Sequence, residues 1–210
     1  MHVHRNRAAG CLRAGLAALV FAGSGLLPTI AGATDFNASG SVSFNGHAAN
    51  LADGLFIGSS YATATGAVGA GHFKFVGASV GDGTVALVFD LGQANTSSGL
   101  VTANGAASLA SASLVLSVTS ATYNGSPIVV GADCVFQPVN VVLHGDGTLT
   151  ALDLGAGGFT VPAIDGNACN GFAAAIGNVL VGNDTDIVLQ VDGDFDPPGT
   201  LFDYGFEPVR

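Results

Sequence analysis

Apolar residues in this chain recur at every second position in short runs, and helical spacing is nearly absent. In the stretch ASASLVLSVTSATYNG, for example, Leu114, Leu116 and Val118 fall on one side of an extended chain. The stretch ends at Asn124-Gly125, a pair typical of two-residue hairpin turns. Because a period of two is that of a β-strand, the sequence predicts a mostly β fold made of hairpins.

Comparable strand-and-turn units fill most of the chain, about ten strands in all. The segment at 169–182 departs from them, with Phe172, Ile176 and Val179 at helical spacing. Asn170 stands where it could cap that helix. We therefore predict an all-β fold, an antiparallel β-sandwich with one short helix near residues 170–180. A closed β-barrel is the alternative.

Two local features refine this prediction. Pro138 lies inside a predicted strand, which indicates a sheet edge or a β-bulge because proline cannot donate a ladder hydrogen bond. The stretches GDGTVALVFDLG (81–92) and GDGTLTALDLG (145–155) look alike. They are either one hairpin used in each half of a pseudo-symmetric sandwich or a chance similarity in a chain rich in Gly, Thr and Leu.

The N-terminus has the three parts of an export signal. Three arginines within the first thirteen residues precede an apolar run over 14–27, and Ala31-Gly32-Ala33 is a small-x-small cleavage site. The run is shorter than the ~20 residues that span a bilayer, and a retained anchor is the alternative. We expect residues 1–33 to be a signal peptide cleaved after Ala33. The protein is then secreted, periplasmic or on the cell surface.

Removal of this segment changes the charge balance. Lys74 and Arg210 remain as the basic residues against all fifteen acidic ones, which gives a net charge of −13. Such a field repels phosphate backbones and anionic lipid headgroups. The composition therefore argues against a nucleic-acid partner, and against membrane contact after signal removal.

Two cysteines, Cys134 and Cys169, follow the signal. In an oxidising compartment, a pair without metal-ligand spacing is most simply a disulfide. Two buried free thiols are the alternative.

Few residues are available for catalysis. The histidines after the signal are His47, His72 and His144, and no G-x-S-x-G nucleophile motif is present. We therefore assign no catalytic residue. Hydrolysis by paired aspartates stays open because acidic residues are numerous, although three tyrosines and no tryptophan offer little for holding a sugar.

The C-terminal stretch DGDFDPPGTLFDYGFEPVR is acidic and contains two adjacent prolines. We divide the chain into a single β-domain over 34–194 and an acidic linker with a tail over 195–210. Four aspartates also occupy positions 1, 3, 5 and 12 of a calcium loop: Asp192, Asp194, Asp196 and Asp203. Position 6 is Pro197 where such loops have glycine. A linker without a cofactor is therefore the preferred interpretation, and calcium binding is the alternative.

Two parts of the chain are similar to known exported proteins. The stretch LFDYGFEP (201–208) resembles the short Phe-x-x-Gly-Phe-Glu ending of many otherwise unrelated exported bacterial proteins, which implies an appended sorting or surface segment. Residues 108–191 carry, in order, TYNGSPI, Cys134, GGFTVPAID, Cys169 and VGNDTDIVL. Together these resemble the C-terminal part of small exported bacterial β-domains of uncharacterised function. That resemblance supports the disulfide and implies no activity.

The composition, with 10% charged residues and many small ones, favours a non-enzymatic secreted or cell-surface β-domain with a structural or adhesive role. Lysines on edge strands commonly discourage pairing with another chain, and after signal removal this protein has only one. Its predicted edge strands can therefore pair between copies, although the negative charge opposes such self-association at low salt. One alternative is the paired-aspartate hydrolase. The other is a module for a small apolar ligand of unknown identity, in a pocket lined by Phe73, Phe75, Phe89, Leu114 and Leu116.

Overall fold

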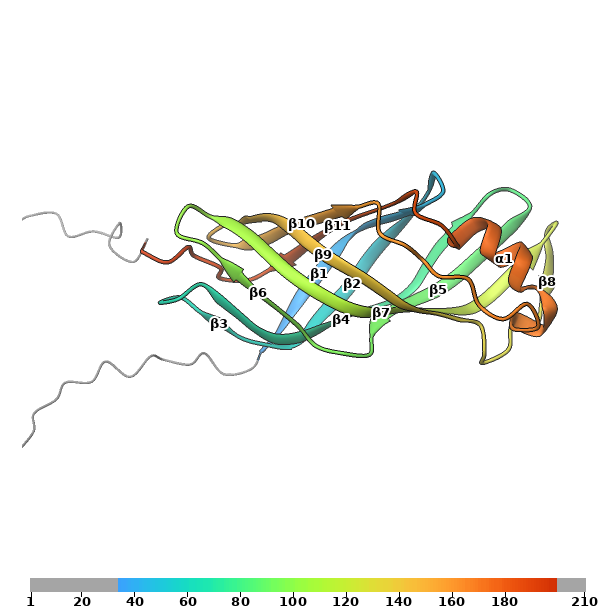
Figure 1. Cartoon of the computed structure of the whole chain (residues 1–210), viewed down its shortest axis with the longest axis horizontal. Helices are drawn as coiled ribbons and strands as arrows, with labels where there is room; N and C mark the ends of the chain where they lie inside the picture. The colour runs from blue at the N-terminus through green and yellow to red at the C-terminus, as the bar shows by residue number, and fades with distance from the viewer. Residues whose placement is uncertain (1–33, 200–210) are drawn as a thin grey trace, which may run out of the picture.

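The computed structural model describes residues 34–199, without the side chains of residues 34, 111 and 112. The predicted signal peptide with Ala33, and the tail with Asp203, lie outside the described residues. Eleven strands, one 3-10 turn and one α-helix make up the described part (Figure 1). In chain order they are β1 (Thr34–Phe44), β2 (His47–Ser59), β3 (Tyr61–Ala62), β4 (Ala67–Gly81), β5 (Val85–Gln93), β6 (Ser97–Val101), β7 (Ala106–Tyr123), β8 (Ser126–Ile128), β9 (Val135–Gly147), β10 (Ala151–Gly157), η1 (Cys169–Gly171), α1 (Ala173–Leu180) and β11 (Thr185–Asp192).

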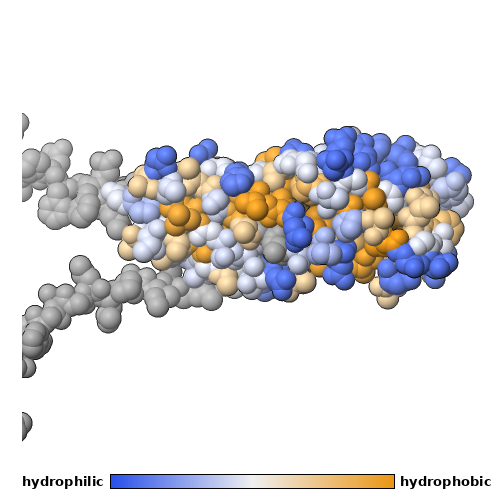
Figure 2. Space-filling view, viewed as in Figure 1, coloured by the Kyte–Doolittle hydropathy of each residue, from blue (hydrophilic) through white to orange (hydrophobic). Residues whose placement is uncertain are grey.

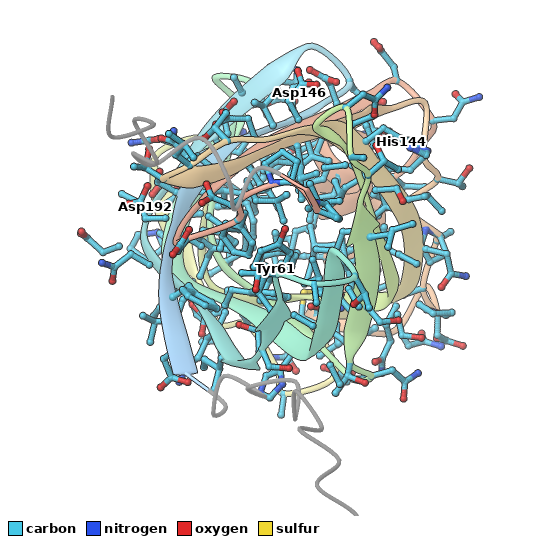
Figure 3. All side chains as sticks on the ribbon, turned by 90° about the vertical axis from the view of Figure 1, so that its left-hand side faces the viewer. Tyr61, His144, Asp146 and Asp192 are labelled. Carbon is cyan, nitrogen blue, oxygen red and sulfur yellow. A yellow bond between two sulfur atoms is a disulfide. The ribbon has the colours of Figure 1, made fainter. Side chains whose placement is uncertain are left out.

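The strands form one antiparallel sheet in the order β2-β1-β11-β10-β9-β7-β5-β4. β2 also pairs with β4, between Leu55↔Lys74 and Ile57↔His72, so the pairing path returns to its start. Viewed end-on in Figure 3, the strands surround an interior filled by side chains. The predicted all-β antiparallel fold with one short helix is confirmed, and the arrangement is consistent with the preferred sandwich.

Three short strands are attached to this path. β6 pairs with both β4 and β7, whereas β3 pairs only with β4 and β8 only with β7. β3 has two residues, and β8 contains Pro127. Short length and proline both discourage pairing with another chain. Among the described strands, these two edges therefore offer little for the self-association that the sequence suggests.

The alternation in the sequence determines which side chains point inward. In β11, Ile187, Leu189 and Val191 are buried, whereas the residues that alternate with them are exposed. Phenylalanines fill much of the interior, and Phe73 stacks on Phe56 and Phe75 with ring centroids 4.6 and 6.2 Å apart. Full burial of such a side chain contributes ~1.5–3 kcal/mol, so this core is the main source of stability.

Two of the Asn-Gly pairs form tight turns between paired strands. Asn45-Gly46 joins β1 to β2, and Asn124-Gly125 joins β7 to β8. All four residues have positive φ, between 48° and 80°. Positive φ at both central positions is the requirement of a type I′ hairpin turn, so the prediction made for Asn124-Gly125 is confirmed.

Asn45 also holds the helix. Its side-chain amide donates to the carbonyl oxygens of Asn178, Val179 and Val181 at 3.2, 3.2 and 3.1 Å. These oxygens belong to the last turn of α1 and the residue after it, where a helix leaves carbonyls without intrahelical partners. The β1–β2 turn therefore caps the C-terminal end of α1.

At three of the β-bulges, on β2, β4 and β7, a polar side chain on the neighbouring strand accepts a hydrogen bond from the bulged backbone. The backbone N–H donates to a side-chain oxygen at 3.0, 2.9 and 3.0 Å in the pairs Gly58 with Asp35, Gly77 with Asp90, and Ser113 with Asn140. The first residue of each pair has positive φ. Pro138 lies where the β7–β9 register shifts, between Leu114↔Val139 and Leu116↔Phe136, so its predicted bulge is confirmed.

The predicted short helix forms as η1 followed by α1. Ile176 and Val179 are fully buried on its inner side. The capping role predicted for Asn170 is wrong. This residue lies inside η1 with φ of 54°, and α1 begins after Phe172 without a side-chain cap. The left-handed backbone turns the Asn170 amide toward Val129 instead, where Nδ2 donates to the carbonyl oxygen at 3.1 Å.

Candidate functional site

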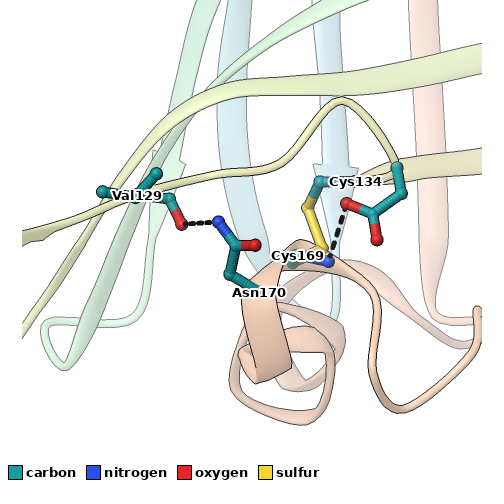
Figure 4. Close-up of a disulfide and its surroundings, with 5 residues drawn as sticks. Val129, Cys134, Cys169 and Asn170 are labelled. Atoms are coloured by element: carbon teal, nitrogen blue, oxygen red, sulfur yellow. Dashed lines mark hydrogen bonds between the residues drawn. A yellow bond between two sulfur atoms is a disulfide. The ribbon is translucent and has the colours of Figure 1, made fainter.

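Cys134 and Cys169 form the predicted disulfide, with their Cα atoms 4.5 Å apart (Figure 4). Both residues are buried. The Cys169 N–H donates to Asp133 Oδ1 at 3.3 Å, beside the Asn170–Val129 bond. The bridge thus links the first residue of η1 to the residue that precedes β9. Its burial makes it a structural cross-link rather than a reactive thiol pair.

The aspartates of the predicted calcium loop do not share one environment. Asp192 ends β11 and is exposed, and Asp194 is also exposed. Asp196 is partly buried, and its Oδ1 is buried with no hydrogen-bond partner. Within residues 34–199, no three His, Cys, Asp or Glu side chains are grouped so that they could hold a metal ion. Calcium binding, which also involves Asp203, stays the alternative to the preferred linker.

Phe195 extends the folded unit beyond the boundary expected at Asp194. Its side chain is fully buried, and its ring centroid lies 5.3 Å from those of Phe36 and Tyr61. Figure 3 looks onto this end of the molecule and places Tyr61 near its centre, over the interior. The core therefore includes a residue that the sequence assigned to the linker, and residues 193–199 cover this end of the sheet.

A side-chain hydroxyl meets a backbone carbonyl at this segment. The Tyr61 hydroxyl donates to the backbone carbonyl oxygen of Asp196. Burial, with the negative charges of Asp196 and Asp194, raises the pKa of Tyr61 to about 12. Burial, with the charge of Asp194, also raises the pKa of Asp196. Tyr61 therefore stays protonated near neutral pH and acts as a hydrogen-bond donor that anchors the segment.

The three histidines lie on separate elements. His47 begins β2, where its charge helps to lower the pKa of Asp82, after the larger effect of the Val85 and Thr84 N–H groups. His72 lies on β4. His144 lies on β9 and is exposed, and Figure 3 places it on the outside of the sheet with Asp146. The structure does not bring these histidines together, and none of them is assigned a catalytic role.

Two pairs of aspartates are candidates for the paired-carboxylate chemistry. Asp146 and Asp153 stand directly opposite each other on β9 and β10, exposed on the outer face, and Gln190 Nε2 donates to Asp153 Oδ1 at 3.1 Å. Asp53 and Asp192 line a surface hollow of about 410 Å³. No aromatic ring lines that hollow. The first pair lies on an open surface, and the second lacks the ring that usually holds a sugar.

The five residues proposed to line an apolar pocket belong to the core instead. They are Phe73, Phe75, Phe89, Leu114 and Leu116, each at most 3% exposed. Phe73 and Phe75 stack on each other, and Phe89 packs edge-on against Phe44 at 5.8 Å. These side chains fill the interior between the strands, so they contact one another where the hypothesis placed a ligand.

The chain matches no protein-family model, and searches of curated proteins and of solved structures found no match. Within the described residues, no helix has the length and apolar character needed to cross a membrane. By its structure, the described part of the chain is a disulfide-bonded, all-β antiparallel domain.

Proposed function

We propose that this protein is a secreted or cell-surface β-domain without catalytic activity that serves an adhesive role. The observation that carries the proposal is an outer face on β9, β10 and β11 where two exposed valines flank the glycines of β10. Val142 on β9 and Val188 on β11 are 52% and 51% exposed. Gly155, opposite Val188, and Gly157 occupy outward positions of β10, so no β10 side chain covers the valines.

The shape of the domain supports display of such a face. The two ends of the described chain lie at the same end of an elongated body, and α1 and β8 lie at the opposite end (Figure 1). Figure 2 shows hydrophobic residues along the middle of one long side, with many hydrophilic residues toward the α1 end. A body attached through its chain ends would present its long sides, the β9–β11 face among them, to a neighbouring surface.

Secretion is the part of the proposal that the disulfide supports, because stable disulfides form in oxidising compartments. The test is N-terminal sequencing of protein recovered from the medium or the cell surface. The sequence should begin at Thr34, within about two residues of the expected cleavage site. Recovery of intact Met1 from the medium would contradict export by a cleaved signal.

Adhesion is tested by valine-to-threonine substitutions, each of which replaces one methyl group with a hydroxyl of similar size. Beads coated with the full chain are retained on an octyl-coated surface, in enough salt to screen the net charge. The double variant Val142→Thr, Val188→Thr should be retained less, because the apolar face is lost while the fold keeps its volume. Val129→Thr is the control, since Val129 is 76% exposed and lies outside β9–β11. Equal retention of both variants would count against an adhesive face on β9–β11.

A further inference from the structure

A second feature of the outer surface is a hollow of about 470 Å³ over β4, β5 and β7, with Ile57 of β2 at its rim. Gly92 on β5 forms its floor, opposite Val115 on β7. A Cβ added at Gly92 would meet no atom within 4 Å. The hollow therefore exists because this outward position has no side chain, and its size lies within the ~300–1,000 Å³ of ligand pockets.

Two polar walls of the hollow are fixed by bonds to the protein. Gln93 Oε1 accepts from the Phe73 N–H at 2.7 Å, and Gln93 Nε2 donates to Ser97 Oγ at 2.7 Å. Asp90 Oδ1 accepts from the Gly77 N–H at the β4 bulge. Both side chains are thereby held in place, so the hollow is formed before any ligand arrives.

The charged group that remains available is Lys74. It is the one Lys or Arg within residues 34–199, and it forms no ion pair with the other described residues. His72 stands two positions earlier on the same face of β4, and Ser117 lines the far side. The Lys74 ammonium group attracts a carboxylate, whereas the Asp90 carboxylate in the same hollow repels one, so a ligand's carboxylate is expected beside Lys74 and His72.

The remaining walls are apolar. Ile57, Val76 and Val115 line the hollow, and Val76 keeps 63% of its surface exposed. A ligand that covered these side chains would remove apolar surface from water. The site thus offers an apolar wall on one side and an unpaired ammonium group on the other.

We propose that this hollow binds a small amphipathic carboxylate. Its apolar body covers Ile57, Val76 and Val115, and its carboxylate accepts hydrogen bonds from Lys74 Nζ and His72. A charge-assisted hydrogen bond to Lys74 sets the orientation of the ligand, and the absence of a side chain at Gly92 leaves space for its apolar body. The proposal is independent of the adhesive face, which lies on β9–β11.

Titration of the ¹⁵N-labelled full chain with sodium octanoate tests the site, with 1-octanol and octyltrimethylammonium as matched probes. Octanoate should shift the backbone amides of 72–76, 90–93 and 115–117 and saturate at a Kd of about 1 mM or tighter. Lys74→Gln should weaken binding about tenfold, as expected for one charge-assisted hydrogen bond, and Lys74→Arg should retain it. Gly92→Leu should abolish binding by filling the hollow.

Gly166→Leu is the control for the glycine variant, because Gly166 also has open space around its Cβ position and no left-handed φ. It should bind octanoate like the unchanged chain. Should Gly92→Leu fail to fold, Val76→Glu replaces it, since that exposed position would place a carboxylate in the hollow and repel the ligand. Equal affinity for the uncharged or cationic probe, unchanged binding in the filled variant, or no saturable shift up to about 10 mM octanoate would each overturn the proposal.

Discussion

Exchange of the Asn45 amide for a carboxylate separates the two roles of this residue. Asn45→Asp keeps a residue that tolerates positive φ, so the turn survives. It removes the N–H donors that three carbonyl oxygens of the α1 end share. It also places a negative charge at the negative end of a helix dipole.

The size of the effect follows from these contacts. Two N–H donors serve the three oxygens, and each net hydrogen bond contributes ~0.5–1.5 kcal/mol. Repulsion at the helix end adds ~0.3–1 kcal/mol. We therefore expect Asn45→Asp to lower the free energy of unfolding by about 2–3 kcal/mol, which corresponds to roughly 5–10 °C in melting temperature for a domain of this size.

Asn124→Asp is the matched control. Asn124 has φ of 48° against 50° for Asn45, and a glycine of positive φ follows each. No side-chain hydrogen bond of Asn124 is found within the described residues. The local effect of the exchange is therefore the same at both sites, and the control should change stability by at most about 0.5 kcal/mol.

Urea and thermal unfolding of both variants, followed by circular dichroism, provide the measurement. The deficit of Asn45→Asp relative to Asn124→Asp should also shrink as the pH falls below about 4, where the introduced carboxyl takes up a proton and can donate again. Equal destabilisation of the two variants at neutral pH would refute the capping role of Asn45.

Four further changes test other parts of the structure. The double variant Cys134→Ser, Cys169→Ser should lose about 3–4 kcal/mol, because the bridge closes a separation of 35 residues, and melt roughly 10 °C lower; free thiols in non-reducing peptide maps of the exported protein would refute the bridge. Phe195→Ala should lose about 3–5 kcal/mol if the ring is a core side chain, whereas a linker residue would lose almost nothing in the same unfolding assay. The raised pKa of Asp196 means that the folded state is favoured at low pH and loses this advantage as the pH rises through the raised value; Asp196→Asn should therefore melt above the unchanged chain at pH 7 and not at pH 3. Millimolar calcium should leave the melting temperature unchanged, and a rise of several degrees that Asp194→Asn abolishes would instead establish the calcium loop.

The strand pattern was predictable because burial imposes a period of two on the sequence. The alternation in β11 and the Asn-Gly pair after β7 each identify their element without help from the rest of the chain. The disulfide followed from having two cysteines after the signal. These features depend on local or compositional signals, and such signals are readable in one sequence.

The two GDGT stretches lie in different hairpins, β4–β5 and β9–β10, and at different distances from the turn. Gly83 lies in the turn between β4 and β5 with φ of 88°. In the second copy the chain is still inside β9, and the turn follows Gly147. There Gly145 is required because a Cβ would lie 1.9 Å from the Asp153 carbonyl oxygen on β10.

Phe195 had a usable signal that its neighbours concealed. The inward positions of β11 are odd-numbered, and Ile187, Leu189 and Val191 are followed at the same parity by Gly193 and Phe195. Aspartates on both sides and two prolines afterwards made the segment look like a linker. The sequence around Asn45 does not indicate its hydrogen bonds to α1. The helix end lies more than 130 residues away, and the strands must first assemble into the sheet to bring the two together.

The pairing of β1 with β11 ties the order of synthesis to the order of folding. β1 has β2 as one neighbour within a few residues, but its other neighbour is the last strand, with Ala38 opposite Val191. Until that strand has been made, β1 carries an unpaired edge and the ring of strands cannot be completed. Contacts between such distant segments form slowly, because a long loop must close first. A newly made chain would therefore stay open until β11 is available, and folding before that point should stop short of the native sheet.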